Sequence, residues 1–161
     1  MERTVEPLLN RLIDTPLGSM IAATDGDAIV SLDFADEAPD FPNSDHPLLL
    51  RLEKELGEYF AGKRRTFDLP LAPRGTPFQL AVWERLRTIP YGETISYAQE
   101  AERLGNPKAV RAVASANGRN PISILIPCHR VIATGGGLGG YSGGVEKKAF
   151  LLALERHPKS R

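Results

Sequence analysis

The sequence of 161 residues contains a single cysteine, Cys128, and only three histidines, His46, His129 and His157. One cysteine excludes an internal disulfide bond. The histidines are too scattered to give the ligand spacing of a structural zinc site. We therefore expect no metal in this protein, and no cofactor-binding motif stands out elsewhere in the chain.

Long apolar stretches are also missing. No run approaches the roughly 18 residues that a membrane-spanning helix needs, and the segment Met1 to Glu6 lacks the basic and then apolar profile of a secretory signal. We expect a cytoplasmic protein with no membrane partner. The length fits one ordinary domain or two small ones, with enough apolar residues for a real core.

The net charge of the chain is zero, but basic residues are scarce in its first half and acidic residues are scarce in its second half. Residues 1–75 hold 8 Lys and Arg against 14 Asp and Glu, whereas residues 76–161 hold 12 against 6. A basic half beside an acidic half favours a polyanion that docks on the carboxy-terminal half. A solvated charged surface that happens to segregate explains the same counts, so both interpretations stay open.

The amino-terminal part predicts a small sheet followed by a helix. Three strands are expected within residues 11–34, because Asp25-Gly26 between apolar stretches is a strong hairpin signal. A helix is expected over residues 47–61, with Leu49, Leu52, Leu56 and Phe60 on its buried side. The basic cluster Gly62-Lys63-Arg64-Arg65 after it could touch phosphate, or could offset the helix dipole.

Prolines and a glycine mark a linker. After one more expected strand over residues 67–71, Pro70, Pro73 and Gly75 predict irregular chain. We therefore divide the protein into an amino-terminal domain, residues 1–75, and a carboxy-terminal domain, residues 76–161. Thr76-Pro77-Phe78-Gln79 then forms a capping box for a core helix that runs to about Arg87, with Phe78, Val82 and Leu86 on its core face.

Two short helices are expected next. Ser96-Tyr97-Ala98-Gln99 is a second capping box, whose helix ends near Leu104 with Gly105 behind it. Asn106-Pro107 is expected to restart the helix, which continues over residues 108–117. Helices joined through a glycine predict a helix-turn-helix, although an ordinary helical hairpin has the same pattern.

The second of these helices carries Lys108, Arg111 and Ser115 on one side among four alanines. Small side chains let a helix backbone come close to a nucleic-acid groove, and the basic side chains would meet phosphates or bases. Alanine is also simply the best helix former. Nucleic-acid docking and a plain packing helix both remain open on this pattern.

The apolar stretch from Pro121 ends at Pro127, directly before Cys128, and is expected to leave extended structure there. This would place Cys128 at a rim. A thiol reacts as thiolate, and His129 and Arg130 are neighbours that would lower its pKa and relay a proton. Cys128 is therefore a candidate nucleophile.

Seven glycines in the ten residues 135–144 predict either a flexible loop or a place where backbone approaches a ligand closely. The loop lacks the Lys-Ser ending of a phosphate-binding P-loop. A last helix is expected over residues 145–155, with Ala149 and Leu152 on the core. Its Glu155 is either a solvated helix-end charge or the carboxylate that orients His129.

Read together, these motifs resemble the O6-alkylguanine-DNA alkyltransferase family, the methylated-DNA–protein-cysteine methyltransferases. The likeness covers residues 76–161 in order and spacing. The amino-terminal half is similar only in layout. The likeness in residues 76–161 is carried by the stretches Tyr91-Gly92-Glu93, Ile95-Ser96-Tyr97, Arg111-Ala112-Val113, Asn120-Pro121, Pro127-Cys128-His129-Arg130-Val131-Ile132, Tyr141-Ser142-Gly143-Gly144 and Leu151-Leu152 with Glu155.

The resemblance implies an α+β protein, with a small amino-terminal α/β domain of RNase H-like layout and a winged-helix-like carboxy-terminal domain that contains a helix-turn-helix. It implies DNA repair by irreversible transfer of an alkyl group from O6-alkylguanine to Cys128, in one turnover. The partner would be double-stranded DNA, docked by its minor groove with the damaged base flipped out. A monomer is expected, and O4-alkylthymine stays open as a second substrate.

The resemblance also implies the role of each catalytic residue. Cys128 is the nucleophile, His129 is its base through a water, and Glu155 orients His129. Asn120 braces the cysteine loop. Tyr97 gives a proton at the N3 edge of the base, so that guanine leaves as a neutral molecule.

Further residues would hold DNA and substrate. Arg111 would fill the gap that the flipped nucleotide leaves. The carbonyl of Val131 would accept from the guanine amine, as would that of Cys128. The other expected contacts on the DNA are made by Ala112, Ser115 and Arg119, and those on the alkyl and O6 side of the base by Tyr141 and Ser142.

Three positions depart from the family's pattern. Glu100 stands where an aliphatic residue is common, Ala114 where glycine is common, and Asn117 where some members carry a larger residue.

Two alternative functions stay open at this point. One is a module that binds the lesion without reacting, which would not need Cys128. The other is a thiol hydrolase or redox protein, which would need an oxyanion arrangement or a resolving cysteine.

Overall fold

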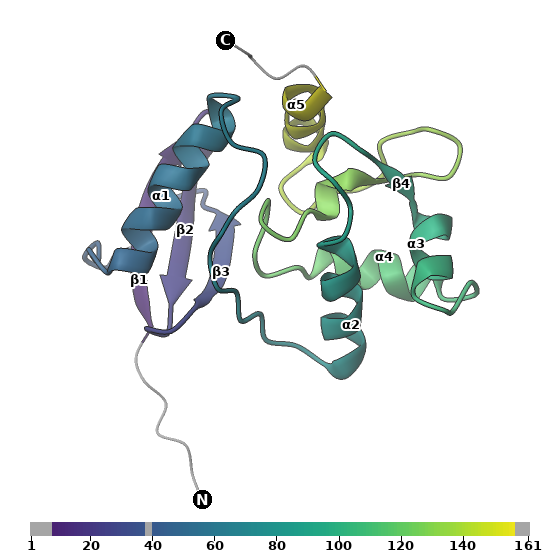
Figure 1. The fold of residues 1–161 in the computed structure, drawn as a ribbon, viewed down its shortest axis with the longest axis horizontal. Coiled ribbons are helices and arrows are strands. Elements are labelled where there is room, and N and C mark those ends of the chain that lie inside the picture. Colours follow the sequence, from purple (N-terminus) through teal and green to yellow (C-terminus); the bar gives the residue numbers. More distant parts are fainter. Residues whose placement is uncertain (1–7, 38–39, 157–161) are drawn as a thin grey trace, which may run out of the picture.

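The computed structural model describes residues 8–37 and 40–156. Predicted features that fall on residues 1–7, 38–39 and 157–161, such as His157 and the amino-terminal segment, lie outside the described residues. The chain forms a sheet with one helix at its amino-terminal end and a group of helices in its carboxy-terminal half (Figure 1). The predicted α+β fold, with a small sheet domain followed by a helical domain, is confirmed.

The sheet consists of β1 (Leu9–Thr15), β2 (Gly18–Thr24) and β3 (Ile29–Phe34), paired antiparallel in that order. The turn before β3 forms as its sequence predicts. Asp25 accepts hydrogen bonds from the backbone N–H groups of Asp27 and Ala28, and Gly26 has a φ of 101° that favours glycine.

Helix α1 (Pro47–Phe60) packs along the sheet (Figure 1). Its N-cap is His46, whose side chain accepts from the backbone N–H of Leu48. The predicted stripe is confirmed at Leu49, Leu52 and Leu56, which are fully buried, and Tyr59 continues it at the end of the helix.

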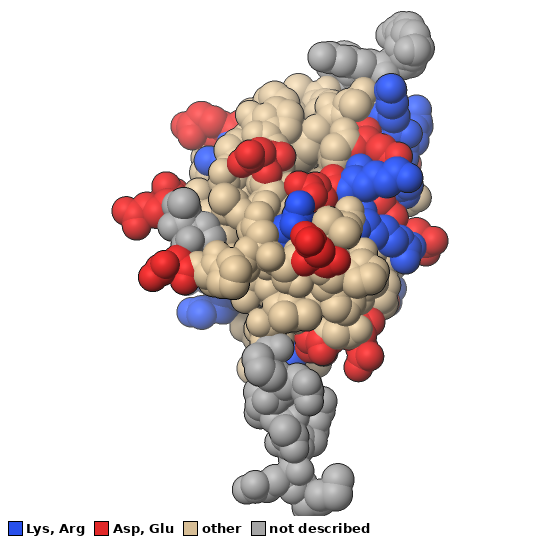
Figure 2. All heavy atoms as spheres, turned by 90° about the vertical axis from the view of Figure 1, so that its left-hand side faces the viewer, with Lys and Arg blue, Asp and Glu red and all other residues tan. Residues whose placement is uncertain are grey.

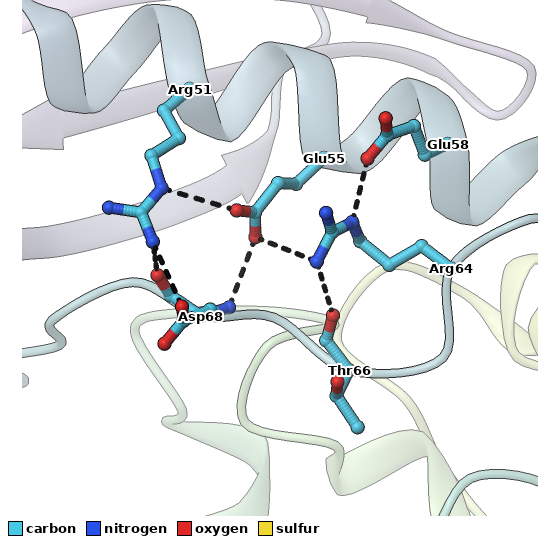
Figure 3. Close-up of polar contacts among 6 residues, drawn as sticks. All are labelled: Arg51, Glu55, Glu58, Arg64, Thr66 and Asp68. Atoms are coloured by element: carbon cyan, nitrogen blue, oxygen red, sulfur yellow. Dashed lines mark hydrogen bonds and ion pairs between the residues drawn. The ribbon is translucent and has the colours of Figure 1, made fainter.

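Arg64 of the basic cluster after α1 pairs with carboxylates of the amino-terminal half, whereas Arg65 lies over the ring of Tyr91 at 5.3 Å. Figure 3 shows Glu55 between two arginines, with Arg51 Nε at 3.3 Å and Arg64 Nη1 at 3.7 Å. Arg64 also donates to Glu58 at 2.8 Å, and the backbone N–H of Asp68 donates to Glu55. This network fastens residues 62–68 back onto α1, so Arg64 neutralises helix carboxylates.

The expected strand over residues 67–71 is wrong. It reduces to one parallel bridge between Leu71 and Ile29 of β3. Pro70 and Pro73 have no backbone N–H, so this segment cannot complete a ladder.

The left-hand side of Figure 1, where β1 and α1 lie, carries separated acidic side chains, with basic side chains gathered mainly along one edge (Figure 2). Acidic side chains lie between the basic ones at this edge. This distribution agrees with the excess of Asp and Glu in residues 1–75.

The carboxy-terminal half contains short elements, each ended by a cap, a turn or a glycine. Both predicted capping boxes form, at Thr76 with Gln79 and at Ser96 with Gln99. The elements are α2 (Pro77–Leu86), β4 (Ile95–Ser96), α3 (Tyr97–Arg103), α4 (Val110–Gly118), the 3₁₀ helix η1 (Cys128–Arg130), β5 (Val131–Ile132) and α5 (Val145–Arg156).

The second helix of the pair starts later than predicted. Asn106 does not cap it. The carbonyl of Asn106 instead accepts from the backbone N–H of Ala109 in a turn, and α4 begins at Val110 without a side-chain cap. Pro107 is favourable both at the second position of such a turn and at the start of a helix. In this protein it lies in the turn.

Two predicted core positions are on the surface. Phe78 in α2 is 37% exposed, and Ala149 in α5 is exposed as well. Their helices bury other residues: Trp83 in α2, which donates from Nε1 to the carbonyl of Ala116 at 2.8 Å, and Leu151 in α5. The Trp83 bond ties α2 to α4.

The two halves share one hydrophobic core. Leu32 of β3 donates its N–H to the carbonyl of Pro121 and accepts from the N–H of Ser123, both at 2.9 Å. The chain just before Cys128 is therefore hydrogen-bonded to the amino-terminal sheet. These two hydrogen bonds fix residues 121–123, at the start of the loop that leads to Cys128, against β3.

A close approach at Gly75 gives a test of the fold. A Cβ added there would lie 2.6 Å from Cη2 of the buried Trp83 ring, whereas one added at exposed Gly57 in α1 would meet nothing within 4 Å. Gly75→Ala should lower the free energy of unfolding by about 1–3 kcal/mol. Gly57→Ala, the control, should raise it by about 0.5–1 kcal/mol. Urea denaturation measures both, and a Gly75→Ala variant as stable as the parent would contradict the predicted contact.

Candidate active site

Cys128 lies inside the molecule. It opens the 3₁₀ helix η1, it is 6% exposed, and its N–H donates to the carbonyl of Ile126 at 2.8 Å. The predicted extended stretch before it is wrong, because residues 121–127 form turns with a single bridge at Ile122, and Ile124 has a φ of 73°. The predicted rim position is wrong for the same reason, since the turns fold the loop back into the core.

Asn120 braces this loop from within. Its Nδ2 donates to the carbonyl of Ile126 at 2.7 Å and to Sγ of Cys128 at 3.3 Å, and its Oδ1 accepts from the N–H of Ile122 at 2.9 Å. One amide side chain therefore fixes both ends of the loop and the thiol together.

Burial raises the pKa of the Cys128 thiol to about 11, and the hydrogen bond from Asn120 opposes this only in part. The expectation that His129 and Arg130 lower this pKa is wrong for the resting protein. Both side chains are engaged elsewhere, and a desolvated thiolate is costly. The thiol is therefore protonated at neutral pH.

His129 and Arg130 both turn to Glu155. His129 Nε2 lies 2.7 Å from Glu155 Oε2, while Arg130 donates from Nε and Nη2 to the two carboxylate oxygens at 2.8 and 3.0 Å. The Tyr59 hydroxyl donates to Oε2 at 2.6 Å, and the N–H of Gly92 donates to Oε1 at 3.2 Å. Glu155 is thus a buried carboxylate with donors on both oxygens.

The protonation states follow from these contacts. Burial alone would raise the pKa of Glu155, but the bonds from His129 and Arg130 outweigh it and hold that pKa well below its usual range. Burial lowers the pKa of His129 against the pull of the carboxylate. An ionised Glu155 accepts only, so the neutral imidazole carries its proton on Nε2 and leaves Nδ1 as a free base. Nδ1 is buried and has no hydrogen-bond partner in the described part of the chain.

Cys128 borders a cavity of about 370 Å³, a size typical of small-molecule sites. Helix α3 contributes one wall, α4 a second and the glycine-rich loop a third. The lining residues are Tyr97, Ala114, Asn117, Gly118, Cys128, Gly140, Tyr141 and Ser142.

The glycine-rich loop packs closely on Tyr97. A Cβ at Gly139 would lie 2.9 Å from Cε2 of Tyr97, and the Tyr97 hydroxyl lies 3.5 Å from the carbonyl of Gly140. Lys148 of α5 donates to that same carbonyl at 3.0 Å, with its Nζ 5.6 Å from the centre of the Tyr97 ring. These contacts hold the backbone of the loop against Tyr97 and Lys148.

Tyr141 and Val131 complete the predicted surroundings of the thiol. The Tyr141 ring meets Phe34 of β3 edge to face at 6.4 Å, so the amino-terminal sheet backs this wall of the cavity. Val131 is fully buried and pairs with Ile95 in the short parallel sheet β4–β5. Ser142 is exposed at the cavity mouth.

The predicted DNA-contacting residues lie together on the outside of α4 and just beyond its end. The side chains of Arg111, Ala112, Ser115 and Arg119 are all exposed. Within residues 8–37 and 40–156, neither arginine forms an ion pair. The face therefore presents two unneutralised charges among small side chains.

The three unusual positions also lie at this site. Ala114 is exposed and lines the cavity. Glu100 of α3 is buried and accepts a hydrogen bond from Asn117 at 2.7 Å.

Reasoning from sequence missed Tyr59 and Lys148, and it assigned Arg130 to the thiol when it pairs with Glu155. Lys148 could have been found, because it lies seven residues before Glu155 on the same buried stripe of α5 as Leu151. Tyr59 has no such signal, since it comes from the other half of the chain.

Neither metal nor membrane features appear among residues 8–37 and 40–156. No group of three His, Cys, Asp or Glu side chains there is placed to hold a metal ion. No helix in the same ranges has the length and apolar character for a membrane span.

A buried thiol that borders an open cavity, next to a helix-turn-helix pair, defines a protein with a candidate nucleophile close to a nucleic-acid-binding motif. The comparisons with known proteins agree. The family description "6-O-methylguanine DNA methyltransferase, DNA binding domain" matches residues 77–157, and its companion "ribonuclease-like domain" matches residues 8–73. The chain belongs to the 6-O-methylguanine DNA methyltransferase family.

Similar proteins carry the corresponding names. The constitutive methylated-DNA–protein-cysteine methyltransferase of Bacillus subtilis is 49% identical in an alignment of 152 positions, which covers 89% of this chain and 92% of that protein. The methylated-DNA–protein-cysteine methyltransferase of Methanosarcina acetivorans is 44% identical, over 89% of this chain and 96% of its own length.

Solved structures match as well. The Mycobacterium tuberculosis O6-methylguanine methyltransferase superimposes with a TM-score of 0.85 at 41% identity, covering 96% of this chain and 97% of that one. The M. tuberculosis OGT in complex with DNA gives a TM-score of 0.84 at 44% identity, covering 91% and 92%. The family is therefore established from both sequence and fold.

The bond from Tyr59 to Glu155 gives a test of the network. Tyr59→Phe should lower the free energy of unfolding at neutral pH by about 1.5–3 kcal/mol, the contribution of a hydrogen bond to a charged group. Glu155 has a lowered pKa, so its contribution is present above the unfolded value near 4.5 and is lost as the pH falls below it. The unfolded state is the same in variant and parent, so the difference between them should hold down to about pH 4.5 and shrink only where the pH reaches the lowered pKa of Glu155 in the folded proteins.

Tyr91→Phe is the matched control for this prediction. The Tyr91 hydroxyl is buried and has no hydrogen-bond partner in the described residues, so its removal should change stability by less than about 0.5 kcal/mol or increase it. Denaturation curves for both variants over a range of pH measure the effect. Equal losses in the two variants would contradict the assigned role of Tyr59.

Proposed function

We propose that this protein repairs O6-alkylguanine in double-stranded DNA by moving the alkyl group irreversibly onto its own Cys128, once per molecule. The observation that carries the proposal is the sole cysteine, held by Asn120 against a cavity beside the His129–Glu155 pair. The names of the similar proteins and the DNA complex of M. tuberculosis OGT support it.

The reaction is a displacement at an sp³ carbon. The bond between Sγ of Cys128 and the alkyl carbon forms while the bond from that carbon to O6 breaks. The thiol proton passes through a water to Nδ1 of His129, and Glu155 stabilises the imidazolium. The product is a thioether, which has no leaving tendency, so the thiol is not regenerated.

Tyr97 protonates the base at N3 as the bond from the alkyl carbon to O6 breaks, so guanine is a neutral leaving group and stays in the DNA strand. Tyr97 regains a proton from solvent and His129 returns its own, so the proton count closes. Burial raises the pKa of Tyr97, which keeps the hydroxyl protonated before the reaction. Its place in the cavity wall supports this role.

The base is held by groups around the thiol. The backbone carbonyls of Cys128 and Val131 accept from the exocyclic amine, and Tyr141 and Ser142 line the O6 and alkyl side. Such polar contacts orient a planar ligand within a mainly apolar pocket.

The helix pair α3–α4 docks in the minor groove. Arg111 enters the stack where the damaged nucleotide flips out, while Ala112, Ser115 and Arg119 contact the DNA around it. Flipping costs a few kcal/mol, and less for a base whose pairing is already weakened. The unpaired charges and small side chains of this surface support the proposal.

We also propose that residues 1–75 and 76–161 are the two domains and that the protein acts as a monomer in the cytoplasm. One chain per lesion suffices for a stoichiometric reaction. A reducing compartment suits a protein whose function depends on one free thiol. No part of the proposed reaction calls for a cofactor, because the lesion itself supplies the alkyl group.

A stoichiometric adduct is the expected result when the protein meets duplex DNA that contains O6-methylguanine. Intact-mass and peptide mass spectrometry should find one methyl group on Cys128, with repaired guanine in equal amount. Cys128→Ser should bind the same DNA without repairing it. Continued turnover, or repair with unmodified Cys128, would refute the proposal. Binding without transfer by the parent would favour the non-catalytic module instead.

A further inference from the structure

Glu100 is an ionisable side chain buried in the core, close enough to Cys128 for its charge to raise the pKa of the thiol. It lies in the first turn of α3 and is 2% exposed. Its Oε1 accepts from Nδ2 of Asn117 at 2.7 Å. The other oxygens of the pair, Glu100 Oε2 and Asn117 Oδ1, are buried without a partner in the part of the chain that the structure describes. Buried carboxylates are rare unless they are paired with a cation, and this one is bonded only to an amide.

The pair stands at the start of a chain of hydrogen bonds that ends at sulfur. The carbonyl of Asn117 accepts from the N–H of Asn120 at 3.2 Å, and Asn120 donates to Sγ of Cys128. Asn117 also forms part of the cavity wall. Glu100 therefore joins the two helices α3 and α4 at the level of the thiol.

The ionisable groups that face Glu100 are few. Cys128 and Tyr97 lie close enough for its charge to raise their pKa values, in each case adding to a larger effect of burial. Lys148 from α5 acts on Cys128 in the opposite sense. Asn117, from α4, is neutral. Burial raises the pKa of Glu100 itself to about 7, and the Asn117 bond opposes this.

We propose that Glu100 is a positioning residue: through Asn117 and Asn120 it holds the thiol and the cavity wall, and its carboxyl must be neutral for the Cys128 thiolate to form readily. This inference rests on the proposed role of Cys128 as the alkyl acceptor. A charged Glu100 would place a second negative charge beside the thiolate in a poorly solvated region. Protonation of Glu100 removes that repulsion while its carbonyl oxygen still accepts from Asn117.

Glu100→Gln separates charge from hydrogen bonding. Glutamine keeps the shape and an acceptor oxygen for Asn117, and it stays neutral at every pH. Glu102→Gln is the matched control, because Glu102 is on the same helix and exposed. The measurement is the single-turnover rate constant for methyl transfer to Cys128 from duplex DNA, taken between about pH 5.5 and about pH 9 and expressed as the ratio of variant to parent.

The ratio for Glu100→Gln should be near one at about pH 5.5, where Glu100 is neutral in the parent. It should rise to about three- to tenfold near pH 8.5, which corresponds to a thiol pKa lower by about half to one unit. The ratio for Glu102→Gln should stay near one throughout. A Glu100→Gln ratio that does not change with pH, or that falls below one at high pH, would overturn the inference.

Glu100→Leu tests the positioning part separately. Like Glu100→Gln it removes the charge, but it also leaves the Asn117 amide without its acceptor, so transfer should be slower than in Glu100→Gln by a similar factor at every pH. A rate equal to that of Glu100→Gln would remove the positioning role. If the parent and all variants form no adduct on Cys128, the proposed function itself fails. Adducts that form with parallel pH profiles in all of them refute only the inference about Glu100.

Discussion

Four residues from three parts of the chain donate hydrogen bonds to the buried carboxylate of Glu155. They are Tyr59 through its hydroxyl, Gly92 through its N–H, and the neighbours His129 and Arg130 through their side chains. Removal of one partner from such a buried ionic cluster leaves uncompensated charge, which is costly. The carboxylate thus fixes the His129 tautomer and the orientation of η1. Through Tyr59 it also fixes the position of α1 relative to the carboxy-terminal half. The surroundings of the thiol depend on this one group.

Around that fixed point the protein buries its nucleophile. A thiol exposed to water would be easier to ionise, but it would also meet oxidants and other electrophiles. Cys128 is kept protonated by burial and held in place by Asn120. In the proposed reaction, a thiolate formed at this buried position would have no hydration shell to shed, which suits a displacement at carbon. The same burial would thus keep the resting thiol protonated and make the thiolate reactive.

Local sequence signals determine the parts of the fold that depend on near neighbours. The capping boxes at Thr76 and Ser96 and the Asp25-Gly26 turn could be predicted because each involves residues within about four positions. Asn106-Pro107 failed because the same residues fit a turn and a helix start, and only the packing of α4 decides between them.

The site residues that belong to recognisable motifs could be predicted from the sequence. The contacts between residues that are distant along the chain could not. Cys128, His129, Glu155 and Asn120 lie together as the resemblance implied. The high pKa of the thiol and the contact from Tyr59 depend on burial and on pairing across 96 positions of the chain, which no local pattern encodes. The buried Glu100 carboxyl likewise became informative only once its partner Asn117 and its distance from solvent were known.

The central claim is that the resting thiol is neutral, and the single cysteine allows a direct measurement. Protein labelled with ¹³C at the cysteine Cβ should give one resonance, whose chemical shift follows the ionisation of Cys128. The account predicts that this resonance stays at the neutral-thiol position up to about pH 9, since the pKa is raised to about 11. A midpoint of ionisation below about pH 8, under the ordinary value for a free thiol, would contradict it.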